Sequence, residues 1–402
     1  MRSAFFLLLL ALASSATLAA DAPGQRFSVS VASLPKPYAT PATDNTSKVV
    51  PRPAGAVLEV PDGFTISVFA ANLPNARWMT VAPNGDVFLA ESGPDKVVVL
   101  RPSADGTHAA SISTYASGFD RPHGLAIHDG SLYVADVKSI WRLRYPDGAL
   151  KATGKRVHIA DTTPPAGVGH FTRDIVFDSK GNLFLTIGSK DNLAENPLPY
   201  ASVQKVNPNG SLSTFASGLR NPVGIAFYPG TDDLYVTVNE RDGLGDSLPP
   251  DYFTRIRQGE FFGWPYAYLG PHPDPTYGAK RPDLVAKTKT PDVLFQAHSA
   301  PLGLVFYEGN QFPAEYKGDA FVALHGSWNS ATPTGYKVVR VHFANGRPAN
   351  AYENFVTGWW DGKSSPAQVW GRPVGLVVAK DGSLLIADDA GKKVWRVAYK
   401  GK

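Results

Sequence analysis

Short apolar segments joined by turns that contain glycine recur along this chain. In the first clear copy, residues 79–91, an apolar run leads into Asn84 and Gly85, and a second apolar run follows. Apolar runs of this length, bounded by turn residues, are typical of β-strands. Similar segments occur at 123–136, 174–186, 223–237, 301–324 and 373–388. Several copies continue into an outer apolar segment, at 96–100, 140–143, 336–341 and 393–397.

Six copies of this unit predict an all-β protein, a six-bladed β-propeller with four-stranded antiparallel blades. The copies are spaced roughly 45 to 80 residues apart, and a closed ring gives each small sheet the neighbours it needs to bury both faces. We assign residues 58–402 to the propeller. Residues 64–69 alternate as a strand does, and we expect them to close the ring by joining the last blade. A β-sandwich or two smaller β domains would explain the strands but not the repeated unit.

The segment before the repeats has a different composition. Arg2, an apolar run over residues 4–13 and small residues up to position 20 are typical of a secretory signal peptide. We expect residues 1–20 to be removed and the mature chain to be exported, to the periplasm or outside the cell. Residues 21–57 are rich in Pro, Ala, Ser and Thr and predict an extended N-terminal arm. No later segment has the roughly 20 apolar residues of a transmembrane helix, so we expect no stable membrane insertion.

The composition excludes several kinds of chemistry. Cys is absent from all 402 residues, which excludes disulfides, thiolate catalysis, cysteine-bound metals and covalently attached c-type haem. The 39 basic and 35 acidic residues are scattered and give a net charge of +4. Because no long run of like charge exists, nucleic acid is not expected as a partner. A small basic excess instead suits an acidic electron carrier or a cell surface.

Basic and polar residues precede the repeated strands at equivalent places. In a propeller, the loops beside the inner strands meet at one end of the central channel. Positive groups gathered around one axis repel each other unless an anion lies between them, and guanidinium groups bind carboxylates well. The pattern predicts a ligand with several carboxylates, although any single arginine could form a salt bridge between blades. The residues at these positions are Arg77, Arg121, His123, His170, Arg173, Arg220, Asn221, His298 and Arg372.

Metal-binding patterns are less clear. The segments that begin at His170 and His298 contain no close pair of His or carboxylate side chains, so zinc or iron bound by imidazole is not predicted. The loop 239–246 is rich in oxygen-bearing side chains and glycine. Such a loop either binds calcium or is a solvated acidic loop, and composition alone does not separate these interpretations.

Five longer segments resemble the glucose/sorbosone dehydrogenase family, which includes soluble PQQ-dependent aldose, sorbosone and pyranose dehydrogenases. The segments are 216–224, 238–246, 263–266, 325–329 and 370–375, and the similarity extends from about Pro61 to Tyr399. The resemblance implies that PQQ lies across the top of a six-bladed propeller, with calcium beside it. It implies an oxidoreductase that oxidises a sugar, a sorbosone-like aldehyde or a polyol by hydride transfer to the quinone. An external acceptor, such as a cytochrome or a quinone, would then take the electrons.

The resemblance also assigns residues to the site. His170 matches the family's general base, and Arg220 is expected to stabilise charge on the quinone oxygen. Calcium is expected on the main-chain carbonyls of Asp242 and Gly243. Ser189 stands where the glucose-oxidising members have an aspartate that orients the base. The residues expected to bind the cofactor are Arg77, His123, Arg173, Arg220, Asn221, His298, His325 and Arg372, with His325 near the position of the family's lysine.

Two other functions are compatible with the same fold. A calcium-dependent propeller lactonase or hydrolase would hold calcium with side-chain carboxylates and amides, and the ring of Arg and His argues against it. A non-catalytic binding propeller is the second alternative, because fold does not imply function.

Aromatic side chains either stack on a sugar ring or pack between blades. The aromatic candidates are Trp264, Tyr266, Trp328, Trp359 and Trp360.

Overall fold

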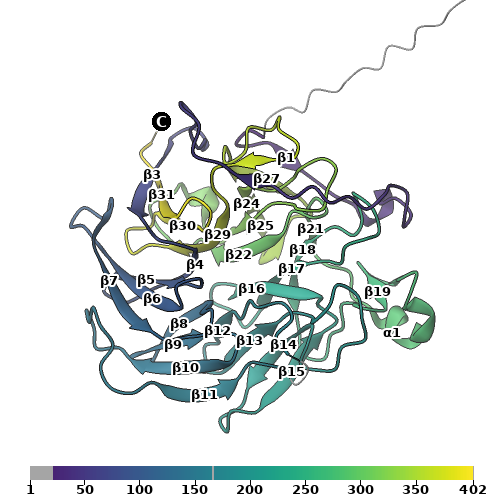
Figure 1. Ribbon diagram of the computed structural model, residues 1–402, viewed down its shortest axis with the longest axis horizontal. Helices are drawn as coiled ribbons and strands as arrows, with labels where there is room; N and C mark the ends of the chain where they lie inside the picture. Colours follow the sequence, from purple (N-terminus) through teal and green to yellow (C-terminus); the bar gives the residue numbers. More distant parts are fainter. Residues whose placement is uncertain (1–20, 165–166, 402) are drawn as a thin grey trace, which may run out of the picture.

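Six small antiparallel sheets surround a central axis, as Figure 1 shows. The computed structural model describes residues 21–164 and 167–401, so the predicted signal peptide lies outside the described residues. In each sheet one edge strand lies nearest the axis, and each of these inner strands contacts the inner strands of its two neighbours. The chain is therefore a six-bladed β-propeller, which confirms the predicted fold.

The first three blades are each built from four consecutive strands, paired in chain order. Blade 1 contains β4 (Ala76–Val81), β5 (Val87–Glu91), β6 (Lys96–Pro102) and β7 (Ala109–Ser117). Blade 2 contains β8 (Gly124–His128), β9 (Ser131–Ala135), β10 (Ser139–Arg144) and β11 (Val157–Asp161). Blade 3 contains β12 (Ile175–Phe177), β13 (Leu183–Ile187), β14 (Ser202–Val206) and β15 (Leu212–Ser217).

The other three blades include additions to this plan. Blade 4 contains β16 (Asn221–Phe227), β17 (Leu234–Asn239), β18 (Tyr252–Ile256) and β21 (Val293–Leu294). Blade 5 contains β22 (Pro301–Phe306), β23 (Ala320–Leu324), β24 (Lys337–Val341) and β27 (Tyr352–Val356), with β1 (Arg26–Phe27) as a fifth strand. Blade 6 contains β29 (Pro373–Val378), β30 (Leu384–Asp388), β31 (Lys393–Tyr399) and β3 (Phe64–Ala71).

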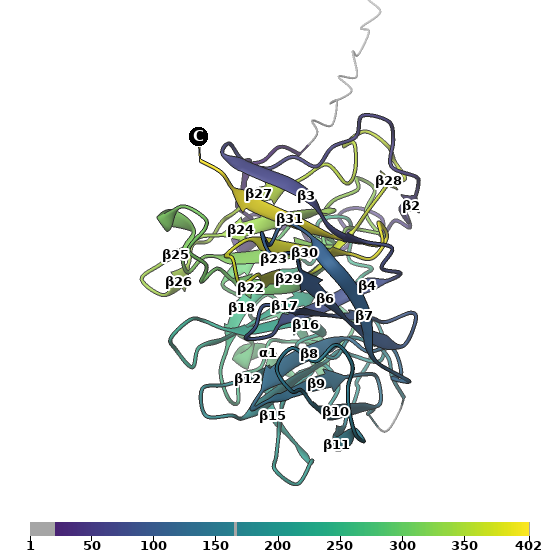
Figure 2. The same ribbon diagram turned by 90° about the vertical axis from the view of Figure 1, so that its left-hand side faces the viewer.

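The ring closes where the start of the propeller meets its end. Strand β3 pairs antiparallel with β31, with Phe64 opposite Tyr399, and the two strands lie side by side in Figure 2. The Phe64 ring also packs edge-on against Phe312, with 4.8 Å between ring centroids. The prediction that residues 64–69 complete the last blade is thus confirmed. This closure ties together segments more than 300 residues apart, as Thr65 and Ala398 illustrate.

Apolar side chains fill the spaces between blades, and glycine lets the inner strands approach closely. Between blades 6 and 1, for example, Leu385 of β30 packs in one cluster with Leu89 of β5. Near the axis, a Cβ atom on Gly303 would lie 2.1 Å from the carbonyl oxygen of Val374, and one on Gly375 would lie 2.4 Å from that of Arg77. Only glycine fits where another backbone approaches this closely. The recurring Gly in the inner-strand motif therefore has a packing cause.

Residues 21–57 do not form a blade but lie against blades 4 to 6. Strand β1 pairs with β27, and β2 (Lys48–Val49) pairs in parallel with β28 (Gln368–Val369). The remaining short elements are η1 (Val31–Ser33), β19 (Ala267–Tyr268), β20 (His272–Pro273), η2 (Gly278–Lys280), α1 (Pro282–Lys287), η3 (Ala314–Tyr316), β25 (Phe343–Ala344) and β26 (Arg347–Pro348). Among the described residues, no helix has the length and apolar character needed to span a membrane.

Candidate active site

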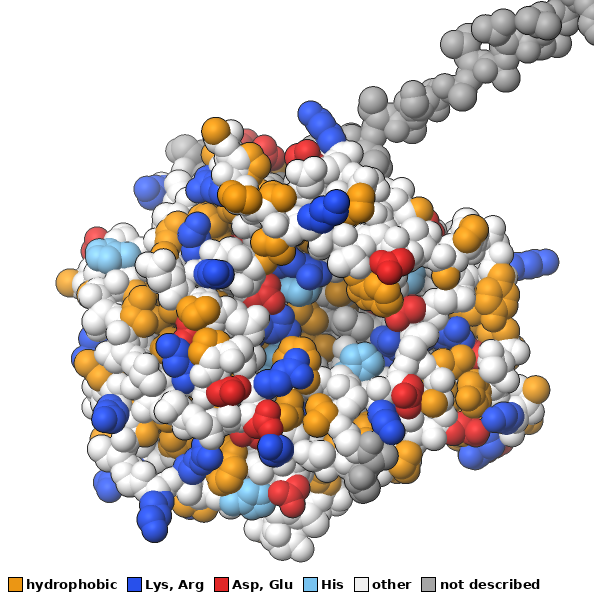
Figure 3. All heavy atoms as spheres, in the orientation of Figure 1, with side chains coloured by type: hydrophobic (Ala, Val, Ile, Leu, Met, Phe, Trp, Pro, Cys, Tyr) orange, Lys and Arg blue, Asp and Glu red, His pale blue; other side chains and the backbone are white. Residues whose placement is uncertain are grey.

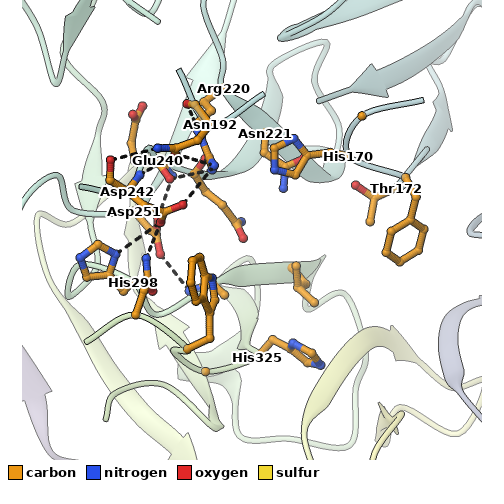
Figure 4. A pocket seen from close by; sticks show the side chains of 18 of the residues that line it. His170, Thr172, Asn192, Arg220, Asn221, Glu240, Asp242, Asp251, His298 and His325 are labelled. Atoms are coloured by element: carbon orange, nitrogen blue, oxygen red, sulfur yellow. Dashed lines mark hydrogen bonds and ion pairs between the residues drawn. The ribbon is translucent and has the colours of Figure 1, made fainter. Parts of the chain in front are cut away.

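A cavity of about 690 Å³ is lined by the loops beside the inner strands. These loops come from different blades, so residues distant in the sequence face one another across it (Figure 4). Figure 3 shows a hollow near the middle of one face, bordered by basic and His side chains. Of the residues predicted for the site, those that line the cavity are Arg77, His170, Arg220, Asn221, Asp242, His298, His325 and Arg372.

His170 precedes β12 and presents a free ring nitrogen at the cavity. Its Nδ1 lies 2.6 Å from the main-chain oxygen of Ser189. Because a carbonyl oxygen only accepts hydrogen bonds, Nδ1 carries the proton and Nε2 carries the lone pair. Burial, followed by the nearby Arg220 guanidinium, lowers the pKa of His170 to about 4. The imidazole is therefore neutral near pH 7, and within the described part of the chain its Nε2 has no hydrogen-bond partner.

The backbone, rather than a carboxylate, orients this histidine. The Ser189 hydroxyl donates to the main-chain oxygen of Asp191 at 2.7 Å and lies 3.3 Å from His170 Nδ1. The Ser189 carbonyl makes the shorter contact with the ring. A main-chain carbonyl therefore fixes the tautomer at the position where the resemblance led us to look for an aspartate.

Arg220 lines the cavity, but its guanidinium is already bound by the protein. Its Nε donates to the main-chain oxygen of Asn192 at 3.1 Å, and its Nη1 donates to that of Glu240 at 2.8 Å. Its Nη2 donates to Asn192 Oδ1 at 3.0 Å and lies 3.4 Å from Asp242 Oδ2. Arg220 therefore joins the loops after β13 and β17. Because its N–H groups are largely used in these bonds, it contributes mainly positive charge to the cavity.

Asn221 lies beside Arg220 at the start of β16 and faces His170. Its Oδ1 is buried, and no described residue donates a hydrogen bond to it. Gly188 explains how these side chains fit together, because a Cβ atom there would lie 2.3 Å from Asn221 Oδ1 and 2.7 Å from His170 Cβ. The glycine at the end of the third blade's second strand thus makes room for the amide and the imidazole.

An acidic group forms the cavity wall on the side of blade 4. Asp251 accepts hydrogen bonds from the main-chain N–H groups of Glu240 and Ala300, each at 2.8 Å. Burial raises the pKa of Glu240 to about 7 and also raises the pKa of Asp251. His298 lies beside them, and its Nε2 donates to the main-chain oxygen of Gly245 at 3.0 Å. Glu240 Oε1 is buried and has no hydrogen-bond partner within residues 21–164 and 167–401.

On the opposite side, a shared carboxylate joins three blades. Asp389 Oδ2 lies 2.6 Å from Arg77 Nη1, and Asp389 Oδ1 lies 3.1 Å from His325 Nε2. Burial, followed by the Arg372 guanidinium, lowers the pKa of His325 to about 4. Arg372 donates through Nε to the main-chain oxygen of His325 at 3.0 Å and through Nη2 to that of Gly326 at 2.9 Å. Arg77 Nε has no protein partner among the described residues.

Two residues predicted to bind the cofactor lie beneath the cavity wall instead. Arg173 is fully buried, and its guanidinium donates to main-chain oxygens of the loop that carries His170, including that of His170 itself at 2.7 Å. His123 is also fully buried and packs on Trp78, with 4.4 Å between ring centroids. Neither residue lines the cavity. In this structure both residues support the surrounding loops, which their sequence positions did not reveal, and their contact with a cofactor stays a prediction.

The loop predicted to bind calcium contributes Asp242 to the cavity lining, whereas Gly243 is not among the lining residues. The main-chain oxygen of Asp242 accepts from Asn192 Nδ2 at 3.2 Å and from Arg241 Nε at 3.1 Å. Within residues 21–164 and 167–401, no group of three or more His, Cys, Asp or Glu side chains is arranged to hold a metal ion. A calcium site here would therefore depend on main-chain oxygens and on the bound ligand, as the resemblance implies.

The structure shows which of the aromatic residues considered for sugar stacking lie at the cavity. Trp328 lines the cavity and is 48% exposed. Trp264 and Trp359 are buried, and Trp359 donates to Asp388 Oδ2 at 3.0 Å. Trp360 donates to Ser364, and the hydroxyl of Tyr266 donates to Glu195, both away from the cavity lining. Only Trp328 of these five is thus placed to contact a ligand in the cavity.

Sequence reasoning missed several residues that build the site. Their shared feature is that they hold other site residues in place: Asn192, Asp251, Asn329 and Asp389. Asp389 directly follows β30, and Asn329 lies in segment 325–329, one of the five that resemble the family. The sequence positions of these two residues therefore gave a partial indication that they belong to the site. Asn192 and Asp251 lie in loops without a repeated pattern, and no signal in this single sequence marks them.

Comparisons with known proteins identify the family of this chain. The family model for glucose/sorbosone dehydrogenase matches residues 125–327, and a TrAA12-like model matches residues 280–400. A protein of Borreliella burgdorferi, described as uncharacterized, is 32% identical over 86% of this chain and 91% of its own length. A pyrroloquinoline quinone-dependent pyranose dehydrogenase of Coprinopsis cinerea is 26% identical over 84% of this chain, which spans about half (54%) of that relative.

Solved structures show the same fold. The holo form of the PQQ domain of Coprinopsis cinerea pyranose dehydrogenase has a TM-score of 0.71 and 22% identity, covering 88% of this chain and all (100%) of that domain. A calcium structure of a Trichoderma reesei enzyme of carbohydrate-active family AA12 has a TM-score of 0.71 and 20% identity, covering 88% of this chain and 99% of that one. The match of the family model to half of the sequence decides the assignment. The chain belongs to the glucose/sorbosone dehydrogenase family.

Proposed function

We propose that this protein uses PQQ, with calcium, to oxidise a sugar, a sorbosone-like aldehyde or a polyol. The observation that carries the proposal is His170, a neutral imidazole whose Nε2 is free at a cavity lined by Arg77, Arg220 and Arg372. A free base beside several guanidinium groups suits the oxidation of a hydroxyl group next to a polycarboxylate cofactor. The names of the pyranose dehydrogenase relative and its PQQ domain support the choice of cofactor.

The cavity lining fits such a cofactor. Arg77 Nε and Asn221 Oδ1 are buried polar atoms without partners in the described part of the protein, and buried polar atoms in folded proteins normally have one. Arg372 binds the protein through Nε and Nη2, which leaves Nη1 for a carboxylate. These groups come from blades 1, 4 and 6, so they would hold a flat, multiply charged ligand from several sides.

PQQ, when bound, supplies the two-electron acceptor that takes a hydride from the substrate carbon. The protein's own contribution begins at His170, whose Nε2 accepts the proton of the substrate hydroxyl. Gly188 leaves room for the imidazole beside Asn221, and the Ser189 carbonyl keeps the proton on Nδ1. Arg220 holds positive charge at the cavity wall, where a developing negative charge is stabilised in a site of low dielectric constant.

Calcium and substrate are further parts of the proposal. Calcium would bind main-chain oxygens of Asp242 and Gly243 and help to balance ligand carboxylates. Asp242 lines the cavity, and the calcium structure of the Trichoderma reesei neighbour supports a metal in this fold. Trp328 offers an exposed indole on which a sugar ring would stack.

The proposed setting is extracytoplasmic. Residues 1–20 would direct export and be removed, leaving a mature enzyme in the periplasm or outside the cell. An external acceptor, such as a cytochrome or a quinone, would take up the electrons, because the chain has no cysteine to hold a covalently attached haem or an iron–sulfur cluster.

Reconstitution tests this proposal. The purified mature chain is titrated with PQQ in the presence of Ca²⁺, and dye reduction is followed with a panel of aldoses, sorbosone and polyols. We expect PQQ to bind and the dye to be reduced only when both PQQ and a substrate are present. Lactone hydrolysis without PQQ would favour the hydrolase, sugar binding without dye reduction would favour the binding propeller, and activity with NAD alone would overturn the proposal.

A further inference from the structure

The N-terminal segment 38–45 crosses two loops that form one wall of the cavity. The first loop joins β17 to β18 and carries Asp242, and the second joins β23 to β24 and carries Trp328 and Asn329. All three of these residues line the cavity. The loops of blades 4 and 5 therefore form the wall, and a segment that belongs to neither blade lies against them outside the cavity lining.

The segment is hydrogen-bonded to the loop of blade 4. The main-chain N–H of Tyr38 donates to the carbonyl oxygen of Leu244 at 2.8 Å. The N–H of Asp246 donates to Thr40 Oγ1, also at 2.8 Å. Between these contacts, a Cβ atom on Gly245 would lie 2.8 Å from Thr40 Oγ1, so the two backbones approach as closely as glycine permits.

Asn45 holds the loop of blade 5. This residue is 9% exposed, and its main-chain N–H donates to the carbonyl oxygen of Trp328 at 2.7 Å. Its Nδ2 donates to the carbonyl oxygens of Ser330 at 2.8 Å and Ala331 at 3.2 Å. The same amide lies 3.1 Å from Ser365 Oγ, in the connection to blade 6. One buried asparagine thus binds the loop on both sides of Asn329.

The two loops are also tied to each other. The N–H of Ala331 donates to Asp246 Oδ1 at 2.9 Å, and Asn329 Nδ2 donates to Asp242 Oδ1. Asp246 therefore contacts Thr40 through its main chain and the blade 5 loop through its side chain. The segment and both loops form one hydrogen-bonded unit, in which Thr40 and Asn45 are the side-chain links from outside the propeller.

We propose that Asn45 and Thr40 are positioning residues that hold this cavity wall in the geometry needed to bind the ligand. The inference rests on the proposed function, because the ligand in question is PQQ with Ca²⁺. A wall that is ordered before binding avoids the entropy that a mobile loop would lose on binding. Segment 38–45 then supports the binding site from outside its lining, in addition to covering the blades.

The experiment compares Asn45→Ala and Thr40→Val with a conservative variant and a control. Thr40→Ser keeps the hydroxyl that accepts from Asp246, and Arg26→Gln removes an exposed ion pair of the same arm with Glu353, away from the cavity. Two quantities are measured: amide hydrogen exchange of the loops in protein without PQQ, and equilibrium affinity for PQQ at saturating Ca²⁺.

We expect Asn45→Ala and Thr40→Val to raise exchange in residues 242–250 and 326–334. We also expect them to weaken PQQ binding by about 3- to 10-fold, the range that the loss of one hydrogen bond produces. Thr40→Ser and Arg26→Gln should match the wild type in both measurements. Unchanged exchange, or faster exchange with unchanged PQQ affinity, would overturn the positioning role alone. Failure of the wild type to bind PQQ would overturn both this inference and the proposed function.

Discussion

Arg77 Nη1 lies 2.6 Å from Asp389 Oδ2, although 312 residues separate the two in the sequence. Arg77 stands in β4 of blade 1 and Asp389 follows β30 of blade 6, so the pair crosses the seam where the ring closes. Asp389 also accepts from His325 of blade 5. His325 and the two arginines Arg77 and Arg372 hold the pKa of this carboxyl well below its usual range despite its burial. One carboxylate thus links three blades at the edge of the cavity.

Replacing that carboxylate should destabilise the protein. Asp389→Asn leaves the buried Arg77 guanidinium without its counter-charge, and loss of one partner of a buried ion pair typically costs about 3–5 kcal/mol. We expect the free energy of unfolding of the PQQ-free protein, from urea denaturation, to fall by about this amount. Asp105→Asn, at an exposed turn, serves as the control. An unchanged urea midpoint in Asp389→Asn would show that the seam does not depend on this pair.

His123 should make the protein sensitive to acid. Its ring is fully buried, and among the described residues neither ring nitrogen makes a hydrogen bond of good geometry, although the main-chain oxygen of Arg173 lies close to the ring. Burial, followed by the nearby Arg77 charge, lowers its pKa well below the usual value. In the unfolded chain the same imidazole takes up a proton near pH 6.5, so its titration leaves stability unchanged above that pH and increasingly favours the unfolded state as the pH falls below it.

His123→Phe removes this titration and keeps an aromatic ring beside Trp78. We expect the melting temperature of the variant to fall less than that of the wild type between pH 7 and pH 5, because the unfolded state no longer gains a proton at this site. At pH 7 the variant should be at least as stable as the wild type, since a buried polar group without partners is lost. Parallel melting curves over this pH range would contradict the assignment.

The sequence was sufficient to predict the propeller because its signal is repeated. Each blade shows the same order of apolar run, turn and apolar run, and residues 64–69 alternate as a strand does. Glycine recurs in the inner strands because the backbone of the neighbouring inner strand leaves no room for a Cβ atom, as Gly303 and Gly375 show. Six similar units that each need two neighbours leave a closed ring as the simplest arrangement.

The candidate site was less predictable, because side-chain direction is a tertiary property. Arg173 and His170 are three residues apart in one loop, yet one lies beneath the loop and the other lines the cavity. Asp389 and Asn192 act by holding Arg77 and Arg220, and such pairings between distant segments leave no local pattern. The fifth strand of blade 5, formed by Arg26 and Phe27, was missed for the same reason.

His170→Ala tests the proposed base. Loss of a general base typically lowers the rate by about 100- to 10,000-fold, and we expect turnover per bound PQQ to fall within that range. The melting temperature and PQQ affinity should change little, because the ring makes its main hydrogen bond to a single carbonyl. Near-normal turnover would move the base elsewhere, and a large loss of thermal stability would instead indicate a structural histidine.

Ser189 offers the sharpest test of how that base is oriented and tuned. In the structure, its carbonyl rather than its hydroxyl holds His170 Nδ1, so Ser189→Ala should lower kcat/KM by no more than about 3-fold, the effect of one weak hydrogen bond. With the pKa of His170 near 4, the part of the pH profile that belongs to His170 should rise through that value and be complete by about pH 5, while Glu240, whose pKa is raised to about 7, titrates separately.

Ser189→Asp places a negative charge beside Nδ1 and should raise the pKa of His170, because a nearby carboxylate favours the imidazolium form. The acid limb of kcat/KM should then move to higher pH, so that the variant is slow at pH 5 and recovers as the imidazole loses its proton. Ser189→Asn has nearly the same size without the charge and should keep the limb near pH 4. If Ser189→Asp and Ser189→Asn show the same limb, the group that titrates in turnover is not His170.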